Sequence, residues 1–105
     1  MSTLSPALEL AAMQASAEQA CRLMKVLTNP DRLMILCQLT QEEKCVSELE
    51  ESLGIMQPTL SQQLTVLRNA ELVTTRREGK NIYYSIADER VEQLLNQLYQ
   101  MFCRK

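Results

Sequence analysis

Three leucines at helical spacing, directly after a proline, constrain this chain more than any other feature of its sequence. Leu60, Leu64 and Leu67 recur at i, i+4 and i+7, and Pro58 suits the first turn of a helix. We therefore predict one apolar seam that packs this helix onto its own domain. The rest of the helix surface carries short hydrogen-bonding groups and no carboxylate: Gln57, Thr59, Ser61, Gln62 and Gln63.

The period of the sequence changes after this helix. Apolar side chains alternate over residues 82–86, a repeat of two that is typical of a strand, and residues 73–77 supply a partner strand. The Glu-Gly-Lys-Asn segment at 78–81 is typical of the turn between them. A helix that leads into a hairpin is the order of a winged helix-turn-helix. The fold class we expect is mainly α with a small β-hairpin.

This part of the chain is basic although the whole chain is acidic. Residues 57–81 contain four basic side chains against two acidic ones, whereas the net charge of all 105 residues is −2. A local positive field favours one surface that faces a polyanion, although a solvated hairpin with incidental arginines has the same composition. Glutamine, serine and threonine bond to bases or phosphates. We predict contacts to double-stranded DNA from eight residues: Gln57, Thr59, Ser61, Gln62, Gln63, Arg68, Arg77 and Lys80.

We expect a single domain over residues 1–105. Residues typical of helix caps predict where its other helices lie. Helices are predicted over 7–19 and 18–27, from Asn29-Pro30 through Leu39, and from Asp88 onward. Ser47 with Glu50 fits a capping box, and Gly54 fits the end of that helix. The helix-turn-helix is thus expected in 46–70 and the wing in 72–87. Ser5 with Pro6 is the signal for the first helix.

Composition excludes several classes of protein. The sequence has no histidine and no Cys-x-x-Cys, which argues against a zinc finger or ribbon and removes the usual general base of an enzyme. It has no glycine-rich phosphate loop. Neither a run of eighteen apolar residues nor a leader or lipidation motif is present. We expect a cytoplasmic protein that is not an enzyme, with no membrane contact, cofactor or metal, and with reduced thiols.

In combination, five segments resemble the ArsR/SmtB family of bacterial repressors: 27–36, 45–49, 57–64, 66–73 and 77–84. The resemblance covers nearly all of the chain. It implies a homodimer joined through the first and last helices, in 1–27 and 88–105, that binds a palindromic operator and is released by an inducer. Apolar faces on both terminal stretches agree with that arrangement, because a chain of this length has little other core to cover them.

The cysteines favour one branch of that family. Metal-sensing members resemble one another in a Cys-Val-Cys box, where this chain has Cys45 and then Ser47, and in a second site that uses histidine. Cys45 at a helix start and Cys103 near the chain end instead resemble the thiol-switch branch that includes the BigR, SqrR and HlyU proteins. That resemblance implies a Cys45–Cys103 dithiol that responds to persulfide, polysulfide or an oxidant. Cys21 and Cys37 are interpreted as small core residues.

Two alternatives stay open at this stage. One is a repressor in which Cys45, with Cys21 or Cys103, binds arsenite, cadmium or lead, because thiolates favour soft metals. The other is a dimeric interaction module that does not bind DNA. The residues do not specify the operator sequence, the genes controlled, the natural inducer, or whether the bridge is a disulfide or a polysulfide.

Overall fold

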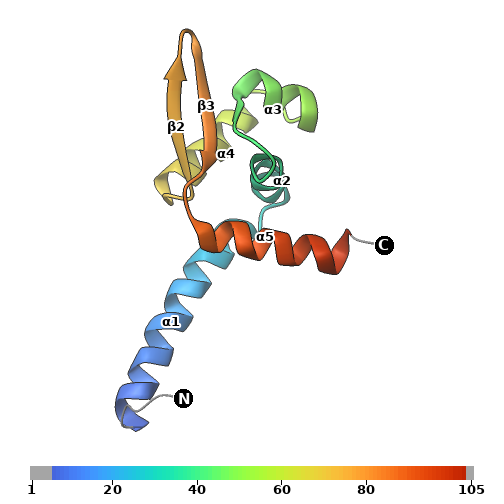
Figure 1. Cartoon of the computed structure of the whole chain (residues 1–105). Coiled ribbons are helices and arrows are strands. Elements are labelled where there is room, and N and C mark those ends of the chain that lie inside the picture. The colour runs from blue at the N-terminus through green and yellow to red at the C-terminus, as the bar shows by residue number, and fades with distance from the viewer. Residues whose placement is uncertain (1–5, 104–105) are drawn as a thin grey trace.

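A computed structural model describes residues 6–103, which form five helices and one three-stranded antiparallel sheet in the strand order β1-β3-β2 (Figure 1). The expected fold class, mainly α with a β-hairpin, is confirmed. The elements in chain order are α1 (Pro6–Leu27), α2 (Pro30–Leu39), β1 (Lys44–Cys45), α3 (Val46–Leu53), α4 (Thr59–Asn69), β2 (Val73–Glu78), β3 (Asn81–Ile86) and α5 (Glu89–Phe102).

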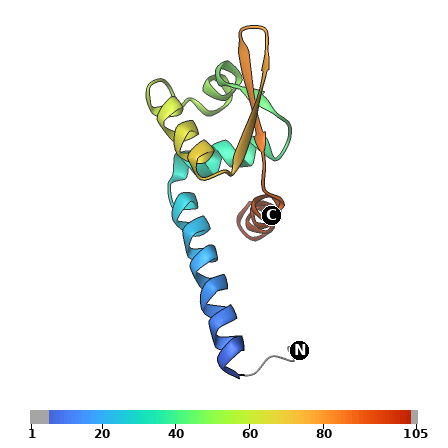
Figure 2. The ribbon, with the colours of Figure 1, turned by 90° about the vertical axis from the view of Figure 1, so that its left-hand side faces the viewer.

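The first helix is longer than the sequence signals predicted. Residues 6–27 form one continuous helix of 22 residues in place of the two stretches expected over 7–19 and 18–27. It extends away from the other elements, as Figure 2 shows. The predicted cap Ser5 lies outside the described residues. Between residues 6 and 103, no helix combines the length and the apolar character that crossing a membrane requires.

The core is built from leucine, isoleucine and valine on the facing sides of four helices. Ile35 and Leu36 of α2 are fully buried, as are Leu49 of α3 and Val91 of α5. The predicted seam of α4 is confirmed, because Leu60, Leu64 and Leu67 are at most 2% exposed. Burying a side chain of this size contributes about 1.5–3 kcal/mol, so these residues fix how the helices pack.

The cap of α3 differs from the prediction. Cys45 is the N-cap residue, and its backbone N–H donates to the Glu48 carboxylate at 3.0 Å, so the predicted Ser47–Glu50 box is wrong. The physical reason is that β1 ends at Cys45 and the helix begins at Val46, before Ser47. This bond lowers the pKa of Glu48. The predicted end of α3 is confirmed, with Gly54 in the left-handed region at φ 70°.

The hairpin is confirmed, and a third strand joins it. β2 pairs with β3 from Val73↔Ile86 to Glu78↔Asn81, which leaves Gly79 and Lys80 as the turn. The third strand, β1, was not predicted from the sequence, and its two residues pair with Tyr84 and Tyr83 of β3. A two-residue strand has no periodic signal of its own. Its effect is to attach the hairpin to the start of α3.

Two of the predicted caps are confirmed and provide a test of the fold. The Asn29 side chain accepts from the Arg32 N–H at 3.1 Å, and Asp88 Oδ1 accepts from the Arg90 N–H at 2.9 Å. Asp88 also pairs with the Arg90 guanidinium at 2.7 Å, and the side-chain hydrogen bond from Arg90 is the main reason that the pKa of Asp88 is lowered.

We expect Asp88→Ala and Asn29→Ala each to lower the free energy of unfolding by about 1 kcal/mol near pH 7, because each removes an N-cap. The loss in Asp88→Ala should disappear as the pH falls below about 4, because a carboxylate with a lowered pKa stabilises the fold only while it is ionised. The loss in Asn29→Ala should not change with pH. Urea unfolding at a fixed protein concentration measures both, and equal pH dependence of the two variants would contradict the assignment.

Candidate nucleic-acid interface and thiol pocket

The polar residues of α4 lie on the outside of the domain, opposite the buried leucine seam. Thr59, Ser61, Gln62 and Arg68 are all exposed. Pro58, at the cap of this helix, supplies no side-chain acceptor for the first amide groups. The first turn therefore presents N–H groups and short side chains at the positive end of the helix dipole, which suits an anionic partner.

Gln57 supports this turn. Its side-chain oxygen accepts from the N–H of Ser61 at 3.2 Å and from the Ser61 hydroxyl, and its amide nitrogen donates to Glu50 of α3 at 3.3 Å. Gln57 thus takes over the cap that Pro58 does not provide and connects α3 to α4. In this structure it stabilises the start of the reading helix.

Gln63 differs from the other polar residues of α4. It is partly buried, and its side-chain oxygen accepts from the Arg32 guanidinium of α2 at 3.0 Å. The carbonyl that an adenine contact would need is therefore already bonded within the protein. The periodicity of the sequence does not predict this bond, because Arg32 and Gln63 are 31 positions apart.

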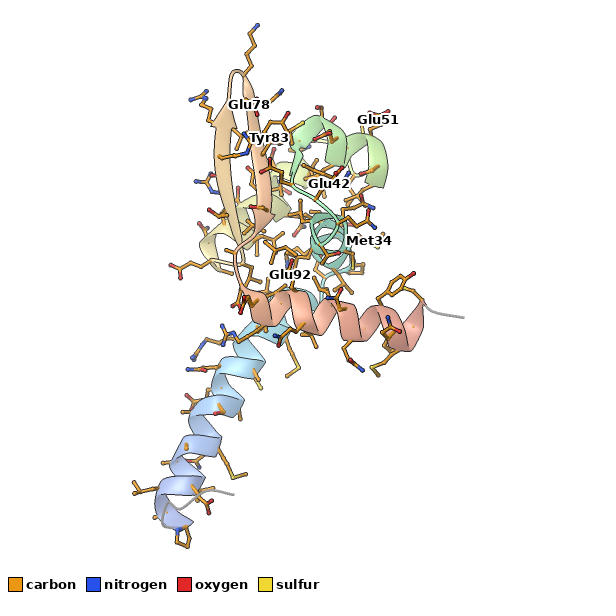
Figure 3. The ribbon with its side chains drawn as sticks, viewed as in Figure 1. Met34, Glu42, Glu51, Glu78, Tyr83 and Glu92 are labelled. Carbon is orange, nitrogen blue, oxygen red and sulfur yellow. The ribbon has the colours of Figure 1, made fainter. Side chains whose placement is uncertain are left out.

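The charged hairpin has one neutralised and two free basic residues near its tip. Arg76 forms ion pairs with Glu43 and with Glu78, the latter at 2.8 Å, and its guanidinium lies over the Tyr83 ring at 4.7 Å. Glu78 and Tyr83 are labelled on the hairpin in Figure 3. These bonds raise the pKa of Arg76, and the bond from Arg76 lowers that of Glu43. Arg77 and Lys80 are exposed. The positive field of the hairpin therefore comes mainly from these two residues.

The four cysteines lie in different surroundings. Cys45 is buried, with 5% of its surface exposed, and its Sγ is 3.2 Å from the Ser47 hydroxyl. Cys103, at the end of α5, is exposed, and so is Cys21 on α1. Cys37 of α2 is half-buried. The interpretation of Cys21 as a core residue is wrong, because its helix extends into solvent.

Cys37 and Cys103 share one apolar pocket. The pocket, of about 260 Å³, lies between α2 and α5, and Met34 in Figure 3 marks its α2 side. Burial raises the pKa of Cys37, and the nearby Cys103 thiolate raises it further. The lining residues are Leu33, Met34, Cys37, Leu95, Leu98, Tyr99, Phe102 and Cys103.

The structure does not bring the predicted pair Cys45 and Cys103 together. Cys45 is held between β3 and the start of α3, and it is not among the residues that line the pocket. Sequence reasoning gave Cys37 only a packing role. The available signal was its place four residues after Leu33, on one side of α2, but the sequence does not reveal which helix covers that side. Over residues 6–103 no three His, Cys, Asp or Glu side chains are grouped to hold a metal ion.

Comparisons with known proteins agree on one family. Residues 29–75 match the family model described as bacterial regulatory protein, arsR family. The Biofilm growth-associated repressor of Agrobacterium fabrum is 50% identical over 94 residues, which cover 90% of this chain and 80% of that protein. The Transcriptional activator HlyU of Vibrio cholerae is 34% identical over 97 residues, which cover 92% and 90% of the two chains.

Two solved structures extend the similarity to three dimensions. The repressor BigR from Xylella fastidiosa has a TM-score of 0.85 at 45% identity, and the match covers 90% of this chain and 97% of that one. A homodimeric winged helix-turn-helix DNA-binding domain from Mycobacterium bovis has a TM-score of 0.73 at 34% identity, over 96% and 89% of the two chains.

The thiol surroundings predict an order of alkylation. We expect iodoacetamide to modify Cys103, exposed at the end of α5, well before buried Cys45 in the native protein. The rate at Cys37 should also rise at higher pH in the native than in the urea-unfolded protein, because only thiolates react and folding raises the pKa of Cys37. Peptide mass spectrometry after timed quenching measures this, with urea-unfolded protein as the control in which all four react. Modification of native Cys45 as fast as Cys103 would contradict the structure.

Proposed function

The chain belongs to the arsR family of bacterial regulatory proteins, and on that premise we propose that it is a homodimeric transcriptional repressor that binds double-stranded DNA at a palindromic operator. Members of this family are regulators and not enzymes. The winged helix-turn-helix fold supports DNA binding. The repressor relative from Agrobacterium supports repression of transcription as opposed to activation. The observation that carries the mechanism is the pocket shared by Cys37 and Cys103.

The apolar surface of the outer helices supports the homodimer. Leu8, Met13 and Met24 of α1 are half or more exposed, and Phe102 of α5 is 77% exposed. Side chains of this size need cover from water, and within one chain α1 has too few neighbours to supply it. A second copy would cover both helices and set the distance between the two α4 helices. That distance has to match half-sites about 34 Å apart on the DNA.

The exposed groups of α4 and of the hairpin supply the DNA contacts in this proposal. Thr59, Ser61 and Gln62 face outward at the start of the reading helix and are placed to reach base edges or phosphates. Arg68, Arg77 and Lys80 are exposed positive groups for the phosphate backbone. Gln57 contributes chiefly by holding α4 in position, because its side chain is bonded to Ser61. Gln63 combines its bond to Arg32 with an NH2 group that faces the DNA.

The hairpin provides a test of DNA binding with an internal control. Arg77→Gln and Lys80→Gln should each weaken binding about equally on operator and unrelated DNA, and should lower the slope of log affinity against log salt by about 0.9 per phosphate contact in each protomer. Arg76→Gln should change the slope less, because Arg76 is already paired with two glutamates. Fluorescence anisotropy over a salt series measures this. Equal slopes in all four proteins would rule out phosphate contacts from the hairpin, and absence of binding by the wild-type protein would favour a module that does not bind DNA.

We further propose that the inducer acts on a dithiol formed by Cys37 and Cys103. Cys103 is exposed and is therefore the first thiolate to meet a reagent. Cys37, half-buried with a raised pKa, is suited to react second, within the pocket. The pairing of Cys45 with Cys103, expected from the sequence, is the second candidate, with Cys45 buried against β3.

A persulfide can serve as the oxidant that converts the two thiols to a disulfide. The Cys103 thiolate takes the outer sulfur of a persulfide RSSH, which releases the thiol RSH and leaves a persulfide on Cys103. The Cys37 thiolate then attacks the inner sulfur, a disulfide forms, and hydrosulfide leaves. Two thiols are oxidised and one sulfane sulfur is reduced to sulfide. With peroxide the intermediate is a sulfenic acid, and water leaves instead.

A bridge across the pocket would weaken DNA binding through the geometry of the dimer. It would attach the end of α5, an outer helix, to α2, which packs against the reading helix. A change in the tilt or separation of the two α4 helices would lose the fit to at least one half-site. Coupling of this kind is typically worth about 5- to 150-fold in affinity.

Three serine variants test the dithiol. Reduced protein treated with glutathione persulfide, and separately with hydrogen peroxide, should give a Cys37–Cys103 bridge in tryptic mass spectra and should lose operator affinity. Cys37→Ser and Cys103→Ser should abolish both effects, and Cys45→Ser should retain both.

Other outcomes lead to different conclusions. Loss of the bridge in Cys45→Ser and in Cys103→Ser, with the bridge retained in Cys37→Ser, would restore the pairing predicted from the sequence. Absence of any bridge, together with stoichiometric thiolate-to-metal absorption on addition of arsenite, cadmium or lead, would favour the soft-metal sensor. A bridge that leaves operator affinity unchanged would rule out the dithiol as the switch.

A further inference from the structure

One side chain joins three helices in the middle of the domain. The guanidinium of Arg32, in the first turn of α2, donates from Nε to the Val26 carbonyl of α1 at 2.6 Å and from Nη1 to Gln63 Oε1 of α4 at 3.0 Å. The backbone N–H of Arg32 bonds to the cap residue Asn29. A planar guanidinium holds its acceptors at fixed angles. The end of α1, the start of α2 and the middle of α4 are thus held in one relative orientation.

This contact decides what Gln63 offers to DNA. A glutamine amide has an acceptor oxygen and a donor NH2 group, and Arg32 is a donor only, so the Gln63 oxygen must be the atom that faces it. A bidentate adenine contact needs the oxygen and the nitrogen together. The bond from Arg32 occupies one of the two lone pairs of this oxygen and fixes the amide plane. We therefore expect Gln63 to contact DNA mainly through its NH2 group, which suits acceptors such as guanine O6 or N7, thymine O4 or a phosphate oxygen.

The helix that carries Arg32 also carries one side of the thiol pocket. Leu33, the next residue, lines the pocket, and so does Cys37, four positions after Leu33 along α2. Ten helical residues span about 15 Å, and over that length a helix moves nearly as a rigid unit. A shift of α2 at Cys37 consequently reaches Arg32 and, through one hydrogen bond, the reading helix.

We propose that Arg32 is a positioning residue that couples the thiol pocket to DNA recognition by holding Gln63. The regulatory half of this inference rests on the dithiol switch proposed above. In the reduced protein the Arg32–Gln63 bond fixes the donor face of Gln63. Bridging Cys37 to Cys103 moves α2, the bond is lost, and the fit of α4 to its half-site is lost with it.

A double-mutant cycle with a matched control tests this coupling. Gln63→Met and Arg32→Met each remove the bond, whereas Gln63→Glu keeps an acceptor oxygen for Arg32 and strengthens the contact by adding charge. The ratio of operator affinities between reduced and bridged protein, about 5 to 150 for a typical switch, should fall toward one in each Met variant and no further in the double variant. Gln63→Glu should bind DNA more weakly in both states and keep the ratio.

Two further measurements distinguish the positioning role of Arg32 from a direct contact with phosphate and from a role in folding alone. Arg32→Met should leave the salt slope of binding unchanged, and a decrease of about 0.9 per protomer would identify Arg32 as a phosphate ligand and overturn the proposal. An unchanged affinity ratio in the Met variants, beside a wild-type protein that switches, would also overturn it. The variants at Gln63 keep the test valid if Arg32→Met does not fold, which thermal unfolding will show.

Failure of the dithiol switch would look different. The wild-type protein would then bind the operator equally well before and after treatment with persulfide. The positioning role would still be measurable in the reduced protein alone, where the operator affinities of Gln63→Met, Arg32→Met and the double variant should be non-additive. Additive losses there would overturn the positioning role independently of the switch.

Discussion

The burial of α2 is the constraint on which the rest of this domain depends. Ile35, Leu36 and Leu39 are at most 4% exposed, and α2 contacts α1, α3, α4 and β3. Because the helix touches so many neighbours, its position fixes the orientation of the reading helix on one side and closes the thiol pocket on the other. Any chemical event that moves α2 must therefore be felt at the DNA-facing surface.

Most of the fold could be predicted from short-range signals in the sequence. The leucine period of α4, the alternation of β3, the Asn29 and Asp88 caps and the end of α3 at Gly54 all lie within a few residues of their effects, and all are confirmed. The misses have a common cause. β1 is a strand only because β3 lies beside it, and the α3 cap moved to Cys45 because β1 ends there.

In the candidate site, too, short-range features were predicted and contacts between distant residues were missed. Periodicity was sufficient to predict the buried and exposed sides of α4, but it gave no indication that Gln63 and Arg76 are engaged by Arg32, Glu43 and Glu78. The thiol pocket is the clearest case. Cys37 and Cys103 are separated by most of the chain, and only the packing of α5 on α2 shows that they face one pocket. Cys45, which the family resemblance singled out, lies at the junction between β1 and α3, and its pairing with Cys103 stays a prediction.

The outward extension of α1 affects how long a single copy of the protein survives in the cell. A helix of 22 residues with a single buried side chain gains little from its own chain, and isolated helices are marginal in water. A newly made copy that has not met another exposes this helix to unfolding and to proteases. Degradation would then remove unpaired copies first, so that the supply of working regulator would rise more steeply than the rate of its synthesis.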